Sequence, residues 1–156
     1  MGLEKIHPGT FKHVPQLRIL NLDDNNLQEL KTGMFVNLAP SRLSFMRNSI
    51  SVLDPGTFQN MSIRLDLNLQ ENKLTEIRRG VFQNVFVRNL ILDGNDISRL
   101  EPGVFASLHT VDELGISLEL SNNHIQRLDS EVFDNEDIIK PNLNNNSVSI
   151  LENQGS

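Results

Sequence analysis

The sequence of 156 residues contains no cysteine. This absence excludes a disulfide framework, a thiolate metal site and a cysteine nucleophile. Long apolar runs are also missing. The first fifteen residues hold none that could form a signal-peptide core, and no later segment approaches the ~18 apolar residues of a membrane span. As written, the sequence predicts a chain that neither enters a secretory pathway by itself nor inserts directly into a membrane.

Basic residues are fewer than acidic residues. The chain carries 14 Lys and Arg against 20 Asp and Glu, which gives a formal net charge of −6 at pH 7. Nucleic acids and anionic membrane surfaces need a concentrated basic face on their partner. The balance therefore argues against both, and a basic protein or peptide is the better expected partner.

Motifs for catalysis and metal binding are missing as well. The chain has no Gly-x-Ser-x-Gly, no phosphate-cradling Gly-Lys-Ser/Thr and no Gly-x-Gly-x-x-Gly string. The string from Asp93 to Asp96 lacks the spacing and the closing Glu of a calcium loop. None of the four histidines forms a zinc-type pair at i, i+4: His7, His13, His109, His124. We therefore expect no enzyme activity, no metal and no cofactor.

What the sequence does contain is a repeated stretch, best seen from Leu17 to Leu38, LRILNLDDNNLQELKTGMFVNL. Its apolar spacing fits neither a continuous helix nor a simple strand. When Leu17 is counted as position 1, positions 4, 6, 11, 14 and 19 are apolar in five successive windows of the chain. The ninth position of these windows is always asparagine: Asn25, Asn48, Asn72, Asn95, Asn123.

Phenylalanine marks the same period. One Phe occurs in each copy, and they are six of the eight in the sequence: Phe11, Phe35, Phe58, Phe82, Phe105, Phe133. Five of them follow a Gly two residues earlier, and three of those Gly follow Pro. A Pro-Gly-x-Phe step suits a tight turn that places a large ring between layers. Such breakers predict short 3₁₀ or irregular turns rather than helices.

The Leu, Asn and Phe pattern resembles the leucine-rich repeat, in the typical class of about 24 residues found in Toll-like receptors and Slit-like guidance proteins. The resemblance implies an α/β-class right-handed solenoid, a horseshoe with a parallel concave sheet and short 3₁₀ or irregular convex segments. It also implies that the ninth-position Asn residues form a structural ladder of backbone hydrogen bonds, and that the Phe residues form a spine. Each repeat encloses one thin layer of apolar side chains, which only a stacked neighbouring repeat can cover.

The frame predicts one elongated leucine-rich repeat domain over residues 1–156. Its expected parts are a partial repeat 1–16, repeats 17–39, 40–63, 64–86, 87–110 and 111–137, a degenerate repeat 138–151 with Asn146, Val148 and Leu151, and a tail 152–156. The chain begins in mid-repeat without a visible cap, so we expect either a fragment of a longer array or ends that another chain covers.

The longest irregularity lies before the strand of repeat 111–137. Leu108 and Leu118 are ten positions apart, whereas Met61 and Leu67, at the same step, are six apart. The segment VDELGIS can itself be read as a strand start on Val111, Leu114 and Ile116. Two registers therefore compete around residues 111–120, and a bulge is expected there.

Positions 3, 5, 7 and 8 of each repeat are expected to point out of the concave sheet, because side chains alternate along a strand. These rows are mostly acidic, so the predicted ligand is a protein or peptide with basic groups and at least one carboxylate. The alternative is a solvated surface that only keeps the array soluble. The candidate binding residues, with Met46 and Ile91 as apolar anchors, are Asp23, Asp24, Arg42, Met46, Arg47, Asp66, Asn68, Gln70, Glu71, Ile91, Asp93 and Glu119.

Two Asn-x-Ser sequons begin at Asn60 and Asn145, and they are candidate glycosylation sites if the parent protein is secreted. By analogy with the resembled family we expect a non-catalytic recognition module from an extracellular or cell-surface receptor or adhesion protein. A structural spacer that self-associates through its uncapped ends, and an intracellular scaffold, are the alternatives.

Overall fold

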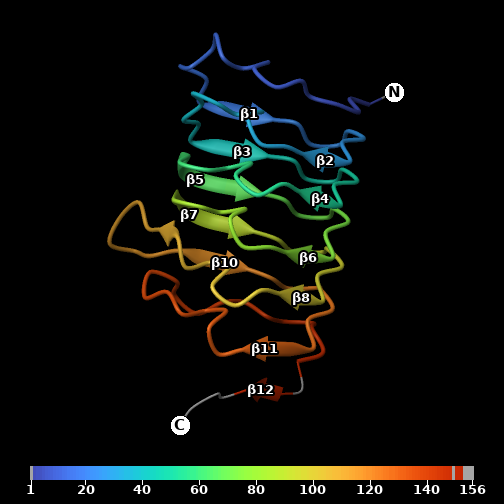
Figure 1. Ribbon diagram of the computed structural model, residues 1–156, viewed down its shortest axis with the longest axis vertical. Helices are drawn as coiled ribbons and strands as arrows, with labels where there is room; N and C mark the ends of the chain where they lie inside the picture. The colour runs from blue at the N-terminus through green and yellow to red at the C-terminus, as the bar shows by residue number, and fades with distance from the viewer. Residues whose placement is uncertain (1, 149, 153–156) are drawn as a thin grey trace.

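The computed structural model describes residues 2–148 and 150–152, and side-chain placements up to Val148. Within these residues the chain winds into one stack of parallel turns from the N-terminus to the C-terminus (Figure 1). Residues 153–156 of the predicted tail lie outside the described residues, as does Met1 of the first partial repeat.

A six-stranded sheet runs along the stack in the order β1-β3-β5-β7-β10, with β9 paired to β7. All its pairings are parallel, and the position-4 leucines align, Leu20 with Leu43 and Leu67 with Leu90. The predicted parallel sheet of a leucine-rich repeat solenoid is thereby confirmed. Its strands are β1 (Ile19–Asn21), β3 (Arg42–Ser44), β5 (Ser62–Asn68), β7 (Val85–Ile91), β9 (Leu108–His109) and β10 (Ser117–Glu119).

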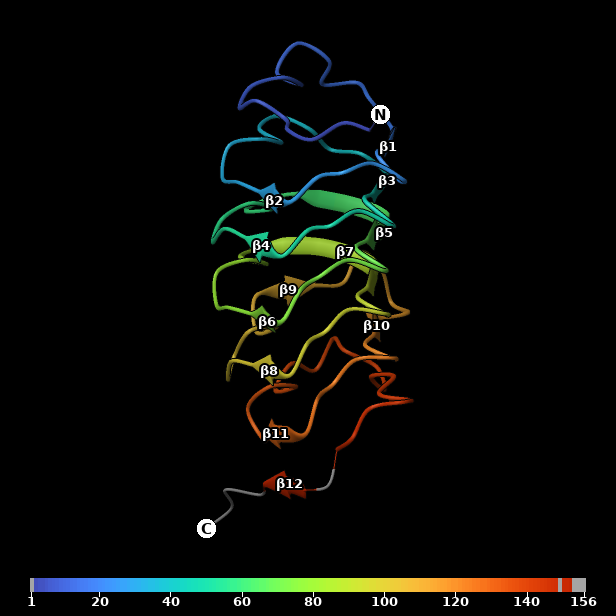
Figure 2. The same cartoon turned by 90° about the vertical axis from the view of Figure 1, so that its right-hand side faces the viewer.

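Shorter strands form a second row on the other side of the stack (Figure 2). They pair in parallel as β2-β4, β6-β8 and β11-β12. Their bounds are β2 (Glu29–Leu30), β4 (Val52–Leu53), β6 (Glu76–Ile77), β8 (Arg99–Leu100), β11 (Arg127–Asp129) and β12 (Ile150–Glu152).

Irregular turns connect the second row to the next strand of the large sheet. Successive hydrogen bonds such as those from Lys12 N to Gly9 O and from Leu38 N to Phe35 O close these turns. No helix occurs in residues 2–148 and 150–152, in keeping with the short irregular segments that the Pro-Gly steps predict. The same residues accordingly contain no helix long and apolar enough to cross a membrane.

The core lies between the two rows of strands. The position-4 side chains Leu43, Leu67 and Leu90 are fully buried because alternation along each strand points them inward. Behind them the phenylalanine rings of neighbouring repeats stack face to face, with centroids 5.9 Å apart for Phe35 and Phe58 and 6.1 Å for Phe58 and Phe82. Stacked aromatic pairs add roughly 0.5–1.5 kcal/mol each beyond the area they bury.

The ninth-position asparagines join consecutive repeats through their amides. Asn72 is 4% exposed, and its Oδ1 accepts a hydrogen bond of 3.0 Å from Ile50 N in the preceding repeat. Its Nδ2 donates to the carbonyls of Phe45 and Leu69, one in each repeat, at 3.0 and 3.1 Å. The same double donation recurs in Asn48, Asn95 and Asn123. Each amide therefore satisfies buried backbone groups where the chain turns away from the strand.

The end of the chain continues the stack. Asn146 accepts from Ile125 N at 3.0 Å and donates to Leu120 O and Leu143 O, as the other ladder residues do. Leu128 of β11 is aligned with the backbone of Leu151 in β12. The degenerate copy therefore has both the ladder asparagine and the second-row strand.

Around the insertion, one of the two competing registers is present. Ser117 and Leu118 pair with Asn89 and Leu90 of β7, which puts Leu118 at position 4 as in the regular frame. Leu114, the key residue of the other register, is 64% exposed. The extra residues form a loop that juts out where the sheet strands begin, between β9 and β10 (Figure 1).

Gly115 closes this loop in a conformation that a side chain would disturb. Its φ is +80°, and an added Cβ would lie 2.7 Å from Cγ1 of Ile139. Gly33 has a similar φ of +91°, but apart from its own residue and its two chain neighbours no described atom lies within 4 Å of such a Cβ. Both Gly→Ala changes incur the left-handed backbone cost of about 1–2 kcal/mol. We expect Gly115→Ala to lower the free energy of unfolding by at least about 1 kcal/mol more than Gly33→Ala, because of overpacking. Urea titrations of both variants measure this, and equal losses would contradict the close contact.

Candidate recognition surface on the concave face

The outward-facing residues of the large sheet form the concave face. Strands about 4.8 Å apart bring the same positions of successive repeats side by side. The register sets Asn68 beside Ile91 and Ile91 beside Glu119 along one row. All twelve predicted binding residues lie in the strands of the sheet or in the turns that directly follow them. Most are half-buried, and Asp24, Arg42, Arg47 and Glu71 are exposed.

Four of the charges on this face neutralise each other in pairs. Arg47 binds Asp24 of the preceding repeat through two hydrogen bonds of 2.6 and 2.8 Å. This guanidinium holds the pKa of Asp24 below its usual value of 3.8. Arg42 Nε lies 3.3 Å from a carboxylate oxygen of Asp66 on the next strand. In each pair the two residues occupy the same repeat position in adjacent repeats, which is position 8 for Asp24 and Arg47 and position 3 for Arg42 and Asp66.

Two further carboxylates bind groups of the neighbouring repeat. Oδ1 of Asp23 accepts hydrogen bonds from Ser44 Oγ at 2.5 Å and from Met46 N at 2.8 Å. Oδ1 of Asp93 accepts one of 2.9 Å from Ser121 N. These aspartates therefore connect consecutive strands where the sheet ends, and one oxygen of each is committed inside the protein.

On the concave face, Glu71 and Glu119 form no ion pair with a residue that the structure describes. Glu71 is exposed and receives a long hydrogen bond of 3.4 Å from Gln70 Nε2. Glu119 accepts from Ser117 Oγ at 3.2 Å and from Asn142 Nδ2 at 2.7 Å. Asn68 is bound locally, because its Oδ1 accepts from Gln70 N at 2.9 Å. The free negative charge thus lies around β5, β7 and β10.

The apolar part of the face has one member that the sequence did not nominate. Met46 and Ile91 are half-buried, as are Asn68 and Glu119 on either side of Ile91. Ile19 on β1 is 59% exposed, the highest value for a large apolar side chain in this sheet. Its position 3 in the repeat places it in the rows that the sequence predicts to point outward, although it is not among the candidate binding residues.

The pKa of Asp93 on this face is shifted upward, opposite to the pKa of Asp24. Desolvation raises the pKa of Asp93 above its usual value of 3.8, and the hydrogen bonds from Ser121 oppose this only in part. The folded state therefore binds the proton more tightly than the unfolded state. This contribution to stability is present at low pH and is lost as pH rises through the raised pKa.

The variant Asp93→Asn keeps an oxygen for Ser121 N but carries no charge. We expect it to be more stable than the wild type at pH 7 by less than about 1 kcal/mol, because Asp93 is partly exposed and solvent screens the effect. The difference should shrink as pH falls below the raised pKa, where the wild-type carboxyl is protonated. Thermal unfolding of both proteins between pH 3 and 7 measures it. A difference that grows toward low pH would contradict the desolvation.

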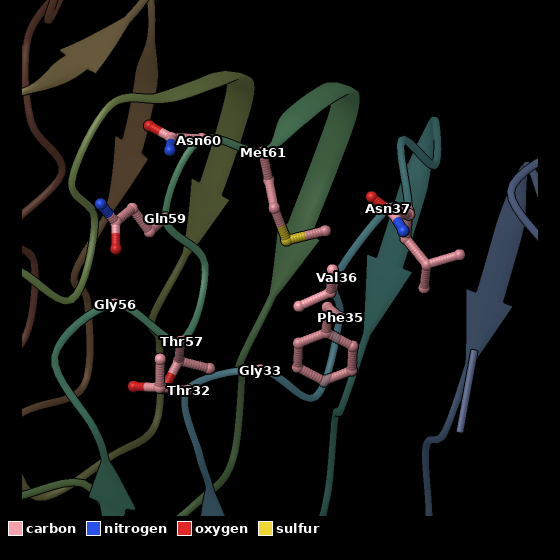
Figure 3. Close-up of a pocket in the computed structure, with 11 residues that line it drawn as sticks. Thr32, Gly33, Phe35, Val36, Asn37, Gly56, Thr57, Gln59, Asn60 and Met61 are labelled. Atoms are coloured by element: carbon pink, nitrogen blue, oxygen red, sulfur yellow. The ribbon is translucent and has the colours of Figure 1, made fainter. Parts of the chain in front are cut away.

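Hollows on the convex side follow the repeat and mark no single site. One of about 480 Å³ lies between neighbouring turns, lined by Gly33, Phe35, Gly56 and Asn60 among others (Figure 3). A second, of about 350 Å³, lies between later turns that carry Gly80, Phe82 and Gly103 at the same repeat positions. Both are the groove that any two stacked turns leave between them, so neither indicates a specific ligand.

Residues 2–148 and 150–152 contain no group of three or more His, Asp or Glu side chains placed to hold a metal ion. The sequon residues Asn60 and Asn145 are both exposed, and both have positive φ, 61° and 57°. Oδ1 of Asn60 accepts a hydrogen bond from Asn84, while Nδ2 of Asn145 donates to Asn122. The glycan-bearing nitrogen is therefore less engaged at Asn60.

Comparison with known families agrees with this geometry. A family model described as leucine rich repeat matches residues 2–42 and 41–85. Together these matches span residues 2–85, more than half of the 156 residues. A search of curated proteins finds no match.

Proposed function

This chain belongs to the leucine-rich repeat family, whose repeats are generally protein–protein interaction modules, and we propose that it binds a protein or peptide ligand on its concave face without catalysing a reaction. The observation that carries the proposal is the unpaired acidic area around an apolar centre. Ile91 lies in register between Asn68 and Glu119, and Glu71 follows the strand of Asn68.

The ligand that fits this area presents a basic side chain beside an apolar one. The basic group would pair with Glu71 or Glu119, and the apolar group would pack on Ile91. The Arg42–Asp66 and Arg47–Asp24 pairs lie on the neighbouring strands toward the N-terminus. A ligand carboxylate that reaches these strands would compete for the arginines, which is why the proposed ligand also carries at least one acidic group.

Charge reversal tests the proposal. Peptides are first selected from a random displayed library on the purified chain. They are then titrated against Glu71→Lys with Glu119→Lys, and against a control with the same charge change, Glu131→Lys with Asp134→Lys, whose sites lie on exposed turns of the convex side. We expect selected peptides to be basic and to lose at least about tenfold in affinity for the first variant only. Equal affinity for both variants would contradict binding at the concave face.

The alternative function, a spacer that assembles with copies of itself, predicts a different solution behaviour. Sedimentation velocity over a wide concentration range separates the two. A monomer throughout supports the recognition module. Association that rises with concentration and is unaffected by the Glu71→Lys, Glu119→Lys change supports the spacer.

We further propose that the protein is extracellular and carries a glycan at Asn60. The support is the exposed side chain and its lightly engaged Nδ2. The chain fused to a secretory leader should lose mass on enzymatic removal of N-glycans when expressed in animal cells. Ser62→Ala should abolish this loss while leaving Asn60 itself in place, whereas Ser147→Ala should not. A wild-type protein without a glycan would argue for the intracellular alternative.

A further inference from the structure

Two irregularities of the repeat meet where the strands of the large sheet begin. The pairing of β5 with β7 shifts between Ile63 and Asp66, so Arg64 and Leu65 together lie opposite Arg88. On the other side of β7, the segment after β9 contains the extra residues of the insertion. A β-bulge re-aims the side chains of the strand that carries it. Both departures from the regular period therefore change the surroundings of the same arginine.

A hollow of about 340 Å³ lies between the bulge and the insertion. This volume is within the range of ligand pockets, roughly 300–1,000 Å³. Unlike the convex grooves, it does not recur between other turns, because it needs residues from the insertion. Its lining is Ser41, Arg64, Leu65, Arg88, Val111 and Asp112.

The charges around this hollow are not balanced. Nη2 of Arg88 forms an ion pair with Asp112, whose other carboxylate oxygen accepts a hydrogen bond of 2.9 Å from Leu114 N. Nε of Arg88 is buried and has no hydrogen-bond partner in the part of the chain that the structure describes. Arg64 is exposed, and its side chain makes no ion pair or hydrogen bond with any described residue. The lining of the hollow therefore contains two guanidinium groups and one carboxylate, and that carboxylate is paired with Arg88 alone.

The insertion is held in place before any ligand arrives. Thr110 N donates to the carboxylate of Asp137 at 3.1 Å, and Thr110 Oγ1 donates to Asp112 O at 2.5 Å. Asp112 N in turn donates to Thr110 Oγ1 at 3.2 Å. A pre-ordered loop lowers the entropic cost of binding.

We propose that this hollow is a second docking site, which binds the carboxylate of an Asp or Glu side chain of a partner protein. Arg64 supplies a bidentate donor to that carboxylate, and a small rotation of Arg88 offers its unpartnered Nε to the same group. Leu65 and Val111 pack against the apolar stem of the bound side chain. The partner carries an acidic group because the site holds one uncompensated positive charge. The site is separate from the concave face and does not depend on its ligand.

Nuclear magnetic resonance titration with two small probes tests the proposal. The probes are acetyl-Leu-Glu-Leu-amide and acetyl-Leu-Gln-Leu-amide, which differ only in the carboxylate. We expect the Glu probe to shift the Arg88 Nε–H and Val111 amide signals along a saturable curve, and the Gln probe to shift them little. Residues of the concave face, such as Ile91, should not respond.

Matched variants identify the arginine that matters. Arg64→Gln should weaken the Glu probe at least about fivefold, as expected when a charge-assisted bidentate contact is lost. Arg99→Gln removes another exposed arginine, from β8 in the second row, and should change nothing. Unchanged binding by Arg64→Gln, or equal shifts with both probes, overturns the proposal. Arg64 and Arg99 are both exposed, so the spectra of the two variants should otherwise match the spectrum of the wild type.

Discussion

Replacement of Phe82 by alanine is expected to lower the free energy of unfolding by about 3–5 kcal/mol. The ring is 1% exposed and stacks between Phe58 and Phe105, with both centroid distances 6.1 Å. Its removal leaves a cavity inside a single layer of side chains and also ends two aromatic contacts. Neighbouring repeats depend on each other for burial, so the loss should be seen as one cooperative shift of the urea unfolding curve.

Phe86 provides the control for this prediction. It lies four residues away, is 38% exposed and stacks on His109 at 4.7 Å. We expect Phe86→Ala to cost clearly less than Phe82→Ala, because more than a third of the Phe86 surface stays in water and its removal opens no enclosed cavity. If Phe82→Ala does not fold, Phe82→Leu should give a smaller but measurable loss. Equal effects at positions 82 and 86 would show that the stacked phenylalanines do not support the array.

Replacement of Asn72 by alanine is expected to cost about 2–4 kcal/mol. The bond from Ile50 N to Asn72 Oδ1 is the one that matters most, because this buried N–H would be left without a partner. The carbonyls of Phe45 and Leu69 lose less, since each also accepts a hydrogen bond from a neighbouring ladder residue, Asn48 or Asn95. The expected loss therefore combines the unsatisfied N–H of Ile50, the two carbonyls of Phe45 and Leu69 that each lose one hydrogen bond, and a small cavity.

Asn26→Ala is the matched control for Asn72→Ala. Asn26 is exposed, and its side chain takes part in none of the hydrogen bonds of the described residues. Its replacement should change stability by less than about 0.5 kcal/mol. Urea unfolding measures both variants, and hydrogen exchange of the Ile50 amide reports the ladder directly. A slow Ile50 amide in Asn72→Ala would contradict the predicted orphaned donor.

The sequence predicted the stack because the same few residue types recur at fixed positions. Leucines at positions 4 and 6 must face inward, and one Asn per copy must satisfy the turn, so Leu67 and Asn72 could be placed without coordinates. The position of the ladder asparagine also decides between the two competing registers of the insertion. Asn123 reaches Leu92 O and receives Ile97 N only when Leu118 aligns with Leu90.

Local pairing on the concave face was harder to anticipate. A count of charges at outward positions treats Asp23, Asp24 and Glu71 alike. Their surroundings differ, because the first accepts hydrogen bonds from the next repeat, the second pairs with Arg47, and the third is left exposed. Whether an outward side chain is free depends on its neighbour in the adjacent copy, so the rows have to be read across repeats as well as along them.

The bulge of β5 and the hollow beside it could not be predicted from the sequence. Repeat lengths that differ by one residue show that one repeat has an extra residue. They do not show at which point between the convex turn and the next strand that residue lies. The pairing places the change between Ile63 and Asp66, which turns Arg64 toward the insertion loop. A contact between two irregular segments of different repeats has no periodic pattern from which it could be predicted.

Chemical-shift mapping with a selected peptide tests the central claim, recognition by the concave face, most directly. The account predicts that saturating peptide shifts the amides of β5, β7 and β10, above all those of Glu71, Ile91 and Glu119, while the convex turns around Gly33 and Gly56 stay unchanged. Shifts confined to the convex turns, with the sheet unaffected, would contradict it.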